Sequence, residues 1–186
     1  RAAVSPFDWG AAVPMFDDVY RKVLGSSTRR IGSVEVAVLD RKAATDAVMS
    51  AVQTRSPALV TFCNAHTVNL ARRDPQFRSD LERFLILNDG VGLDLASRSL
   101  FGQAFPDNLN GTDFTPHLLE TAGRPLSVFL VGSKAGVAER AARAIEGRYP
   151  DVTVVGFRDG FFGLDQEAEL TSKIISSGAN LVLAAM

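Results

Sequence analysis

A short apolar run near the middle of the chain is followed at once by an acidic residue and two glycines. Leu85–Leu87 is long enough for one buried strand, Asn88 and Asp89 come where it should end, and Gly90 and Gly92 follow. In α/β proteins such strand ends face a crevice, and the next helix offers free N–H groups to an anion. Asp89 is therefore a candidate general base, with the glycines as substrate-binding positions. The alternative is that Asp89 only caps the following helix.

Polar residues near a second predicted strand end and before a later predicted helix could join Asp89. They are Thr61, Asn64 and His66 around the end of the strand 57–62, and Asn110, Gly111, Thr112 and Asp113 before the helix 114–121. Because the carboxyl ends of parallel strands lie at one side of a sheet, these groups can converge, and their amides and hydroxyls suit sugar hydroxyls. The alternatives are structural: Asn64 as a turn former, Thr112 and Asp113 as helix caps, and His66 as a polar neighbour of the core.

A glycine turn in the second half of the chain is a candidate nucleotide-binding element. Gly132, Ser133 and Lys134 follow the apolar strand 126–131 and precede a predicted helix. Backbone N–H groups at that helix start, with the charge of Lys134, can bind a nucleotide diphosphate. The turn matches neither the dinucleotide fingerprint nor the P-loop, so a plain strand-to-helix turn is an equally good interpretation.

The segment 156–163 combines glycines with phenylalanines and is predicted to be a loop. Gly156 and Phe157 are assigned to the nucleotide site, because aromatic faces can stack on a base. The same aromatic residues can instead close the end of the sheet, and for Phe161 we favour this core position.

Composition excludes several classes of protein. The chain has 186 residues, 46% hydrophobic and 22% charged, with a net charge of −1. This is typical of a folded globular protein, and it gives no overall field that favours nucleic acid. The single cysteine, Cys63, excludes an internal disulfide, and with only two histidines a zinc site is not expected. We see no signal peptide and no apolar run long enough to span a bilayer.

Strands alternate with helices along the chain, which predicts an α/β, Rossmann-like fold with a largely parallel sheet flanked by helices. The predicted strands are 31–39 (a strand or hairpin), 57–62, 85–87, 126–131, 152–155 and 180–184; the predicted helices are 13–24, 40–53, 67–72, 74–84, 91–100, 114–121, 137–149 and 166–176. We predict an N-terminal arm over 1–30 and one domain over 31–186, made of two fused halves, 31–123 and 124–186. The chain stops directly after its last predicted strand, so we expect it to be truncated at the C-terminus.

Taken together and in order, five motifs resemble those of the WecG/TagA/CpsF family of glycosyltransferases. They are Thr61-Phe62-Cys63-Asn64-Ala65-His66, Asn88-Asp89-Gly90-Val91-Gly92, Asn110-Gly111-Thr112-Asp113, Phe129-Leu130-Val131-Gly132-Ser133 and Gly156-Phe157-Arg158-Asp159-Gly160-Phe161-Phe162. The likeness runs from about Ile31 to Met186. The Asp-Gly-x-Gly and Gly-Thr-Asp motifs are specific as a pair, although neither is so alone.

The resemblance implies an inverting transferase that needs no metal and no cofactor and takes a sugar from a nucleotide diphosphate, usually UDP. The implied acceptor is a polyprenyl-diphosphate-linked saccharide at the inner face of the bacterial membrane, and the products feed cell-surface polysaccharides. On this resemblance the general base falls on Asp89 and the pocket asparagine on Asn64. The implied location is cytoplasmic, peripheral to the membrane through a basic C-terminal segment, and a homo-oligomer is possible.

Departures from the family pattern leave alternatives open. Phe62 stands where relatives commonly have Thr, and Asn108 where they often have Arg, which weakens diphosphate capture. The family's Gly-x-Pro-x-Gln-Glu loop and basic C-terminal segment would follow the last predicted strand, where this chain ends. One alternative is a nucleotide-binding α/β module that has lost catalysis. Another, disfavoured by the missing dinucleotide fingerprint, is half of an oxidoreductase.

Overall fold

The computed structural model describes residues 27–185, apart from the side chain of Leu164. The chain divides into two compact units, with the division between Thr115 and Pro116. It falls inside helix α6 (Gly111–Thr121), a short way before the join predicted near residue 123. The predicted helix 13–24 lies outside the described residues, whereas the last residues of the predicted arm belong to the first strand.

Unit 1 begins with an antiparallel hairpin of β1 (Thr28–Ile31) and β2 (Val34–Ala37). Gly32, in the two-residue turn between them, has a φ of +63°, a conformation that L side chains rarely adopt. A strand or a hairpin was predicted for the segment 31–39. The structure has a hairpin there, but its first strand begins earlier, at Thr28. The hairpin matters for the site because Ile31, Val34 and Val36 pack against Cys63 and Ile86 in the core of this unit.

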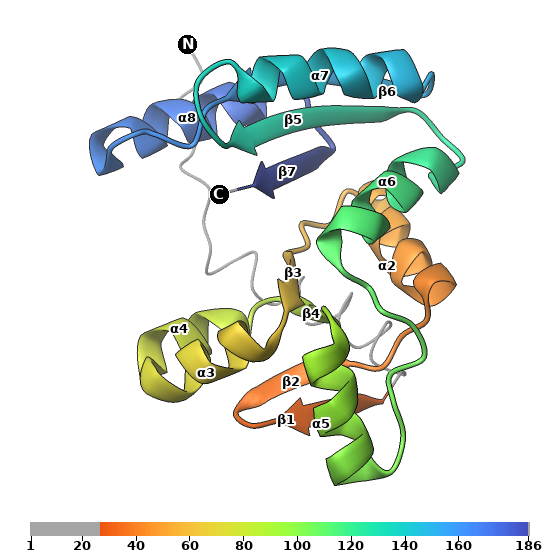
Figure 1. Ribbon diagram of the computed structural model, residues 1–186. Helices are drawn as coiled ribbons and strands as arrows, with labels where there is room; N and C mark the ends of the chain where they lie inside the picture. Colours follow the sequence, from red (N-terminus) through yellow and green to blue (C-terminus); the bar gives the residue numbers. More distant parts are fainter. Residues whose placement is uncertain (1–26, 186) are drawn as a thin grey trace. The chain divides into compact units, whose positions relative to one another are not determined.

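The site-bearing part of unit 1 is a parallel pair of strands, β3 (Val60–Cys63) and β4 (Leu85–Asn88), as Figure 1 shows. The helices of this unit are α2 (Arg41–Thr54), α3 (Ala65–Arg73), α4 (Pro75–Leu81), α5 (Val91–Phe101) and the start of α6. Helix α4 ends before the predicted residue 84, while α3 and α6 begin two and three residues before their predicted starts, 67 and 114. Those early starts put the motif residues themselves into the first turns of helices.

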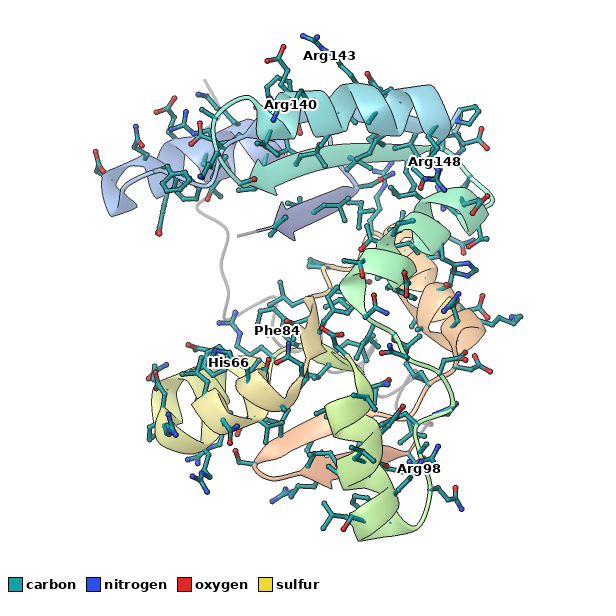
Figure 2. The ribbon with its side chains drawn as sticks, in the orientation of Figure 1. His66, Phe84, Arg98, Arg140, Arg143 and Arg148 are labelled. Carbon is teal, nitrogen blue, oxygen red and sulfur yellow. The ribbon has the colours of Figure 1, made fainter. Side chains whose placement is uncertain are left out.

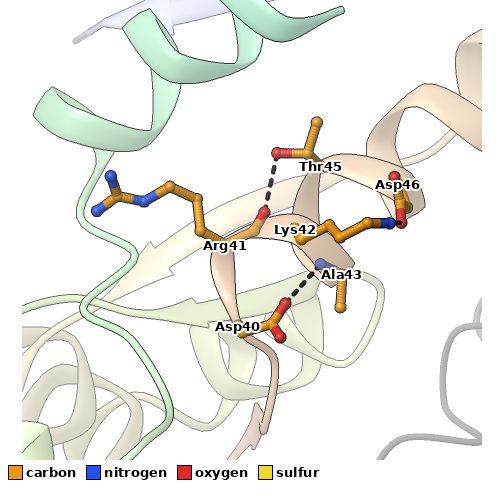
Figure 3. A network of polar contacts seen from close by, with 6 residues as sticks. All are labelled: Asp40, Arg41, Lys42, Ala43, Thr45 and Asp46. Atoms are coloured by element: carbon orange, nitrogen blue, oxygen red, sulfur yellow. Dashed lines mark hydrogen bonds and ion pairs between the residues drawn. The ribbon is translucent and has the colours of Figure 1, made fainter.

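Helix α2 shows how local chemistry sets the element boundaries (Figure 3). The Oδ1 of Asp40 accepts a hydrogen bond from the N–H of Ala43 at 2.7 Å, which caps the first turn. The hydroxyl of Thr45 donates to the carbonyl of Arg41, and the ion pair of Lys42 with Asp46 lies on the solvent side. The sequence predicts Asp40 as the residue that caps this helix, and the structure confirms it as the N-cap. The N–H of Arg41 donates to Oδ2 of Asp107, which ties α2 to the loop that precedes α6.

Unit 2 is a parallel sheet with the strand order β6-β5-β7. Its elements are β5 (Leu126–Gly132), α7 (Val137–Arg148), β6 (Val152–Arg158), the short 3-10 helix η1 (Leu164–Gln166), α8 (Glu167–Ser176) and β7 (Leu181–Ala185). The central strand β5 is almost entirely buried. The strand β6 is longer than predicted, so Gly156 and Phe157 lie in a strand and not in a loop.

The α/β class is confirmed: small, mostly parallel sheets are flanked by helices. Among the described residues the strands form separate small sheets rather than one continuous sheet, and only the β1–β2 hairpin is antiparallel.

Arg29 of β1 is the main polar anchor between the hairpin and α5. Its Nη1 donates to the hydroxyl of Ser97 at 2.6 Å and to the carbonyls of Gln103 and Ala104 at 3.0 and 2.7 Å. The guanidinium also lies over the rings of Phe101 and Phe105. The neighbouring Arg30 instead forms an exposed ion pair with Glu35.

We predict that Arg29→Met lowers the free energy of unfolding by about 2–4 kcal/mol, because it leaves carbonyls unpaired and removes charged hydrogen bonds. The measurement is urea denaturation. The matched control is Arg30→Met, which removes the same group from an exposed pair and should cost under about 1 kcal/mol. Equal losses in the two variants would contradict the anchoring role of Arg29.

Candidate functional site

The register of β3 and β4 brings two sequence-predicted residues together. Cys63 pairs with Asn88, so Asn64 and Asp89 are the first residues beyond the carboxyl ends of adjacent strands. The N–H of Asp89 donates to the carbonyl of Cys63 at 2.8 Å, which continues the ladder by one bond. Asn64 and Asp89 are thereby neighbours at one edge of the sheet, as the sequence predicted.

Helices α3, α5 and α6 all begin close to this edge. A Cβ at Gly92 would lie 3.4 Å from the Cβ of Ala65, so the first turns of α3 and α5 are in contact. A Cβ at Gly111 would lie 3.0 Å from the ring of Phe62, so the start of α6 packs against the end of β3. Each helix start carries partial positive charge and N–H groups without helical partners, so the edge favours a negatively charged group.

The carboxylate of Asp89 is not a helix cap. The N-cap of α5 is Gly90, with a φ of +86° and no side-chain cap, which overturns the alternative that Asp89 serves only as a cap. The carboxylate of Asp89 forms no hydrogen bond or ion pair with any residue from 27 to 185, and its residue is half-buried. It is therefore free to accept a proton from a bound molecule.

Asn64 and His66 occupy the first turn of α3. The Oδ1 of Asn64 accepts hydrogen bonds from the N–H groups of His66 and Thr67 and from the Thr67 hydroxyl, which completes a capping box. A capping role for Asn64 is thus present, and its Nδ2 donates to no described residue. His66 is exposed at the helix start (Figure 2), so it is not a polar neighbour of the core.

The Asn110–Asp113 motif forms the N-terminus of α6. The Oδ1 of Asn110 accepts from the hydroxyl of Thr112 at 2.5 Å and from the N–H of Asp113 at 3.0 Å. The Nδ2 of Asn110 donates to Oδ2 of Asp113 at 2.8 Å. The capping residue is therefore Asn110, whereas Thr112 and Asp113 were the predicted caps. This network fixes the first turn of the helix against Phe62.

Thr61 is not at the strand end. It pairs with Ile86 inside the ladder, two residues before the edge residue Cys63, and it is half-buried. Side chains alternate along a strand, so Thr61 shares a face with Cys63, and Phe62 faces the opposite side beside Gly111. Its assignment to substrate binding stays a prediction.

The loop before α6 supports Asp89, a role that the sequence did not predict. The Nδ2 of Asn88 donates to the carbonyl of Asp107 at 2.8 Å, and the carbonyl of Asn88 accepts from the N–H of Leu109 at 3.1 Å. The Oδ1 of Asn108 accepts from the N–H of Gly90 at 2.8 Å. A local sequence pattern does not predict these bonds, because the partners lie 18 to 21 residues apart in the chain.

In unit 2 the glycine turn after β5 contacts the end of β7 and the segment after β6. A Cβ at Gly132 would lie 2.1 Å from the carbonyl oxygen of Ala185, so only glycine fits where β7 passes. The N–H of Ser133 donates to that same carbonyl at 2.9 Å, and the carbonyl of Ser133 accepts from Gly160 at 2.9 Å. Ser133 itself has a φ of +61°, a left-handed conformation that is uncommon outside glycine. The turn is thus fixed tightly, with Lys134 exposed beside it.

An open hollow of about 200 Å³ lies at the start of α7 in unit 2. Its lining is Ala135, Gly136, Ala138, Glu139, Phe157, Arg158 and Asp159. Gly136 caps α7 without a side-chain hydrogen bond, and the N–H of Val137 donates to the carbonyl of Lys134 at 3.0 Å. The N–H groups of Ala138 and Glu139 are left with no hydrogen bond to a described residue. Phe157 is 48% exposed on one wall, as a base-stacking residue would be.

Two further residues of this segment behave differently from what we predicted. A Cβ at Gly156 would lie 2.4 Å from the ring of Phe129, so this glycine makes room for a core side chain; its nucleotide-binding role stays a prediction. Phe161 is 73% exposed, and the core position that we favoured for it is wrong.

Within the part of the chain that the structure describes, no group of three or more His, Cys, Asp or Glu side chains is arranged to hold a metal ion. No helix there is both long and apolar enough to cross a bilayer.

A model of the glycosyl transferase WecG/TagA/CpsF family matches residues 29–186. The chain belongs to this family. The match covers both units, and it confirms the resemblance drawn from the motifs. Members of the WecG/TagA/CpsF family are glycosyltransferases of cell-surface polysaccharide synthesis.

The pKa of Cys63 depends on its burial and on the nearby Asp89. Burial, with a smaller contribution from the negative charge of Asp89, raises the pKa of the Cys63 thiol to about 12. The thiol is fully buried in the core of unit 1. Since the thiolate is the reactive form, a raised pKa keeps this cysteine inert at neutral pH.

We predict that Cys63 of the folded chain reacts with a thiol reagent at pH 8 at least about a hundredfold more slowly than in the urea-unfolded chain. The measurement is the rate of labelling, which is unambiguous because the chain has one cysteine. Comparable rates in the folded and unfolded chains would contradict this placement of Cys63 beneath Asp89.

Proposed function

We propose that this member of the WecG/TagA/CpsF family transfers a sugar from a UDP-sugar to a polyprenyl-diphosphate-linked saccharide, with Asp89 as the general base. The observation that carries the proposal is the carboxylate of Asp89, which has no hydrogen-bond or ion-pair partner among residues 27–185 and lies at an edge where α3, α5 and α6 begin. A carboxylate that is neither capped nor paired can take a proton from an acceptor hydroxyl.

The proposed reaction is a single displacement. As the acceptor oxygen attacks the anomeric carbon, its proton passes to the carboxylate of Asp89, and the bond between that carbon and the UDP oxygen breaks. The incoming and leaving groups occupy opposite faces, so the configuration inverts. UDP departs with the bonding electron pair, and helix N-termini can stabilise its negative charge without a metal. The Nδ2 of Asn64 and the side chain of His66 are the nearby polar groups that would orient the sugar.

Unit 2 carries the residues that we propose for nucleotide binding. Support comes from the rigid turn of Gly132, Ser133 and Lys134 and from the hollow beside it, with uncapped N–H groups of α7 and the exposed ring of Phe157. Lys134 supplies positive charge, and Phe157 supplies a stacking surface. The polyprenyl-linked acceptor places the protein at the cytoplasmic face of the membrane, and a homo-oligomer is compatible with this arrangement.

A second candidate is a nucleotide-binding module without catalysis. The observation that favours it is that Oδ1 of Asn64 caps α3, while the side chains of Asn110, Thr112 and Asp113 hydrogen-bond to one another at the start of α6. Binding of UDP without sugar transfer, in the complete protein supplied with a lipid-linked acceptor, would select this second function.

We predict that Asp89→Asn lowers kcat for sugar transfer about 10²–10⁴-fold and changes the Kd for UDP less than about twofold, because only the proton acceptor is lost. The measurements are transfer from radiolabelled UDP-sugar and calorimetric UDP binding on the complete protein. Asp80→Asn, the same change at an exposed position on α4, is the matched control and should retain activity. Retained transfer by Asp89→Asn would refute the assignment of the base.

We predict that Phe157→Ala raises the Kd for UDP about 5–50-fold, because a base–aromatic stack contributes about 1–3 kcal/mol. Ile175→Ala on α8, also an exposed apolar residue of unit 2, is the control and should bind UDP normally. Unchanged UDP affinity in Phe157→Ala would remove Phe157 from the nucleotide site.

A further inference from the structure

The side chain of Asp89 has no partner among the described residues, so its position depends on its backbone alone. The Asn88–Asp89 peptide forms two backbone hydrogen bonds. The N–H of Asp89 donates to the carbonyl of Cys63, and the carbonyl of Asn88 accepts from the N–H of Leu109. Among the described residues, the Asp89–Gly90 peptide forms one hydrogen bond, in which the N–H of Gly90 donates to Oδ1 of Asn108 at 2.8 Å. The first two bonds join main-chain atoms, whereas the third depends on a side chain.

The peptide that Asn108 holds lies at a glycine junction. Gly90 has a φ of +86°, no atom lies within 4 Å of where its Cβ would be, and no side chain caps α5. Glycine loses more conformational freedom on folding than any other residue, so this junction needs an external restraint. Asp before a helix also tends to turn back and accept from the N–H groups of the first turn. Such a cap would consume the carboxylate that catalysis needs.

The loop that carries Asn108 is itself fixed from both sides. The carbonyl of Asp107 accepts from Nδ2 of the fully buried Asn88, and its Oδ2 accepts from the N–H of Arg41. Two residues after Asn108, the cap of Asn110 starts α6. Asn108 is exposed and is not part of the core, and its side chain forms one hydrogen bond within residues 27–185, to the N–H of Gly90.

We propose that Asn108 is a positioning residue for Asp89. By holding the N–H of Gly90, it fixes the Asp89–Gly90 peptide and keeps the carboxylate directed to substrate instead of capping α5. This inference rests on the proposed function of Asp89 as general base. Asn108 touches neither substrate nor reacting atoms in this role, because it acts through the backbone.

The test compares Asn108→Ala with Asn108→Asp in the complete protein. Alanine removes the acceptor, while aspartate keeps an oxygen at the Oδ1 position. We expect Asn108→Ala to lower kcat about 10–100-fold, because small misplacements of a catalytic group are costly. The KM for the UDP-sugar, the Kd for UDP and the melting temperature should stay near those of the unchanged protein. Asn108→Asp should recover kcat to within about threefold. Gln53→Ala, which removes an exposed amide from α2, is the matched control and should have no effect.

Hydrogen exchange at the Gly90 amide gives a readout that does not depend on activity. We expect faster exchange of that amide in Asn108→Ala and protection in Asn108→Asp. Unchanged kcat in Asn108→Ala, equal losses of kcat in both variants, or a parallel fall in melting temperature and UDP affinity would each overturn the inference. If Asp89→Asn is inactive while Asn108→Ala is fully active, this inference fails and the proposed function stands. If Asp89→Asn remains active, the proposed function itself fails.

Discussion

The hydrogen bond from the N–H of Asp89 to the carbonyl of Cys63 extends the β3–β4 ladder one residue past the strands. That bond places an acidic side chain beside the start of α3 and directly before the start of α5. A Cβ at Gly92 would contact Ala65 at ordinary van der Waals distance, so the two helix starts meet without distortion. The residues proposed for chemistry thus depend on the register of a short parallel pair.

Polar groups in this region are divided between structure and chemistry. Asn64 and Asn110 use their Oδ1 atoms to cap α3 and α6, and Asn88 uses its Nδ2 to hold the loop before α6. The Oδ1 of Asn88 is buried without a partner among the described residues, an unfavourable state for a buried acceptor. Asp89 is the exception, since its carboxylate has no partner in the part of the chain that the structure describes. The helix that follows Asp89 is capped by Gly90, so its start does not use the carboxylate of Asp89.

In unit 2 the turn after β5 is fixed by backbone hydrogen bonds, whereas side chains fix the helix starts in unit 1. The carbonyl of Ala185 approaches Gly132 so closely that no Cβ fits, and Ser133 accepts a left-handed conformation to continue the turn. Such conformations cost about 1–3 kcal/mol each and persist only where surrounding contacts enforce them. The bonds of Ser133 to Ala185 and Gly160 supply that enforcement. A turn held this firmly presents its N–H groups in a fixed direction.

The sequence by itself determined the α/β class, the strand ends that carry Asn64 and Asp89, and the family, because apolar runs, glycines and short motifs are local signals. The predictions that Gly156 and Phe157 lie in a loop and that Phe161 lies in the core were wrong. The space that Gly156 leaves for Phe129 and the exposure of the Phe161 ring depend on packing between residues distant in the chain. Only the tertiary structure decided that Gly90, not Asp89, caps α5, and that Asn108 restrains the Gly90 peptide. Those contacts join residues far apart in the chain, and a side chain that hydrogen-bonds across such a separation leaves no periodic or local trace in the sequence.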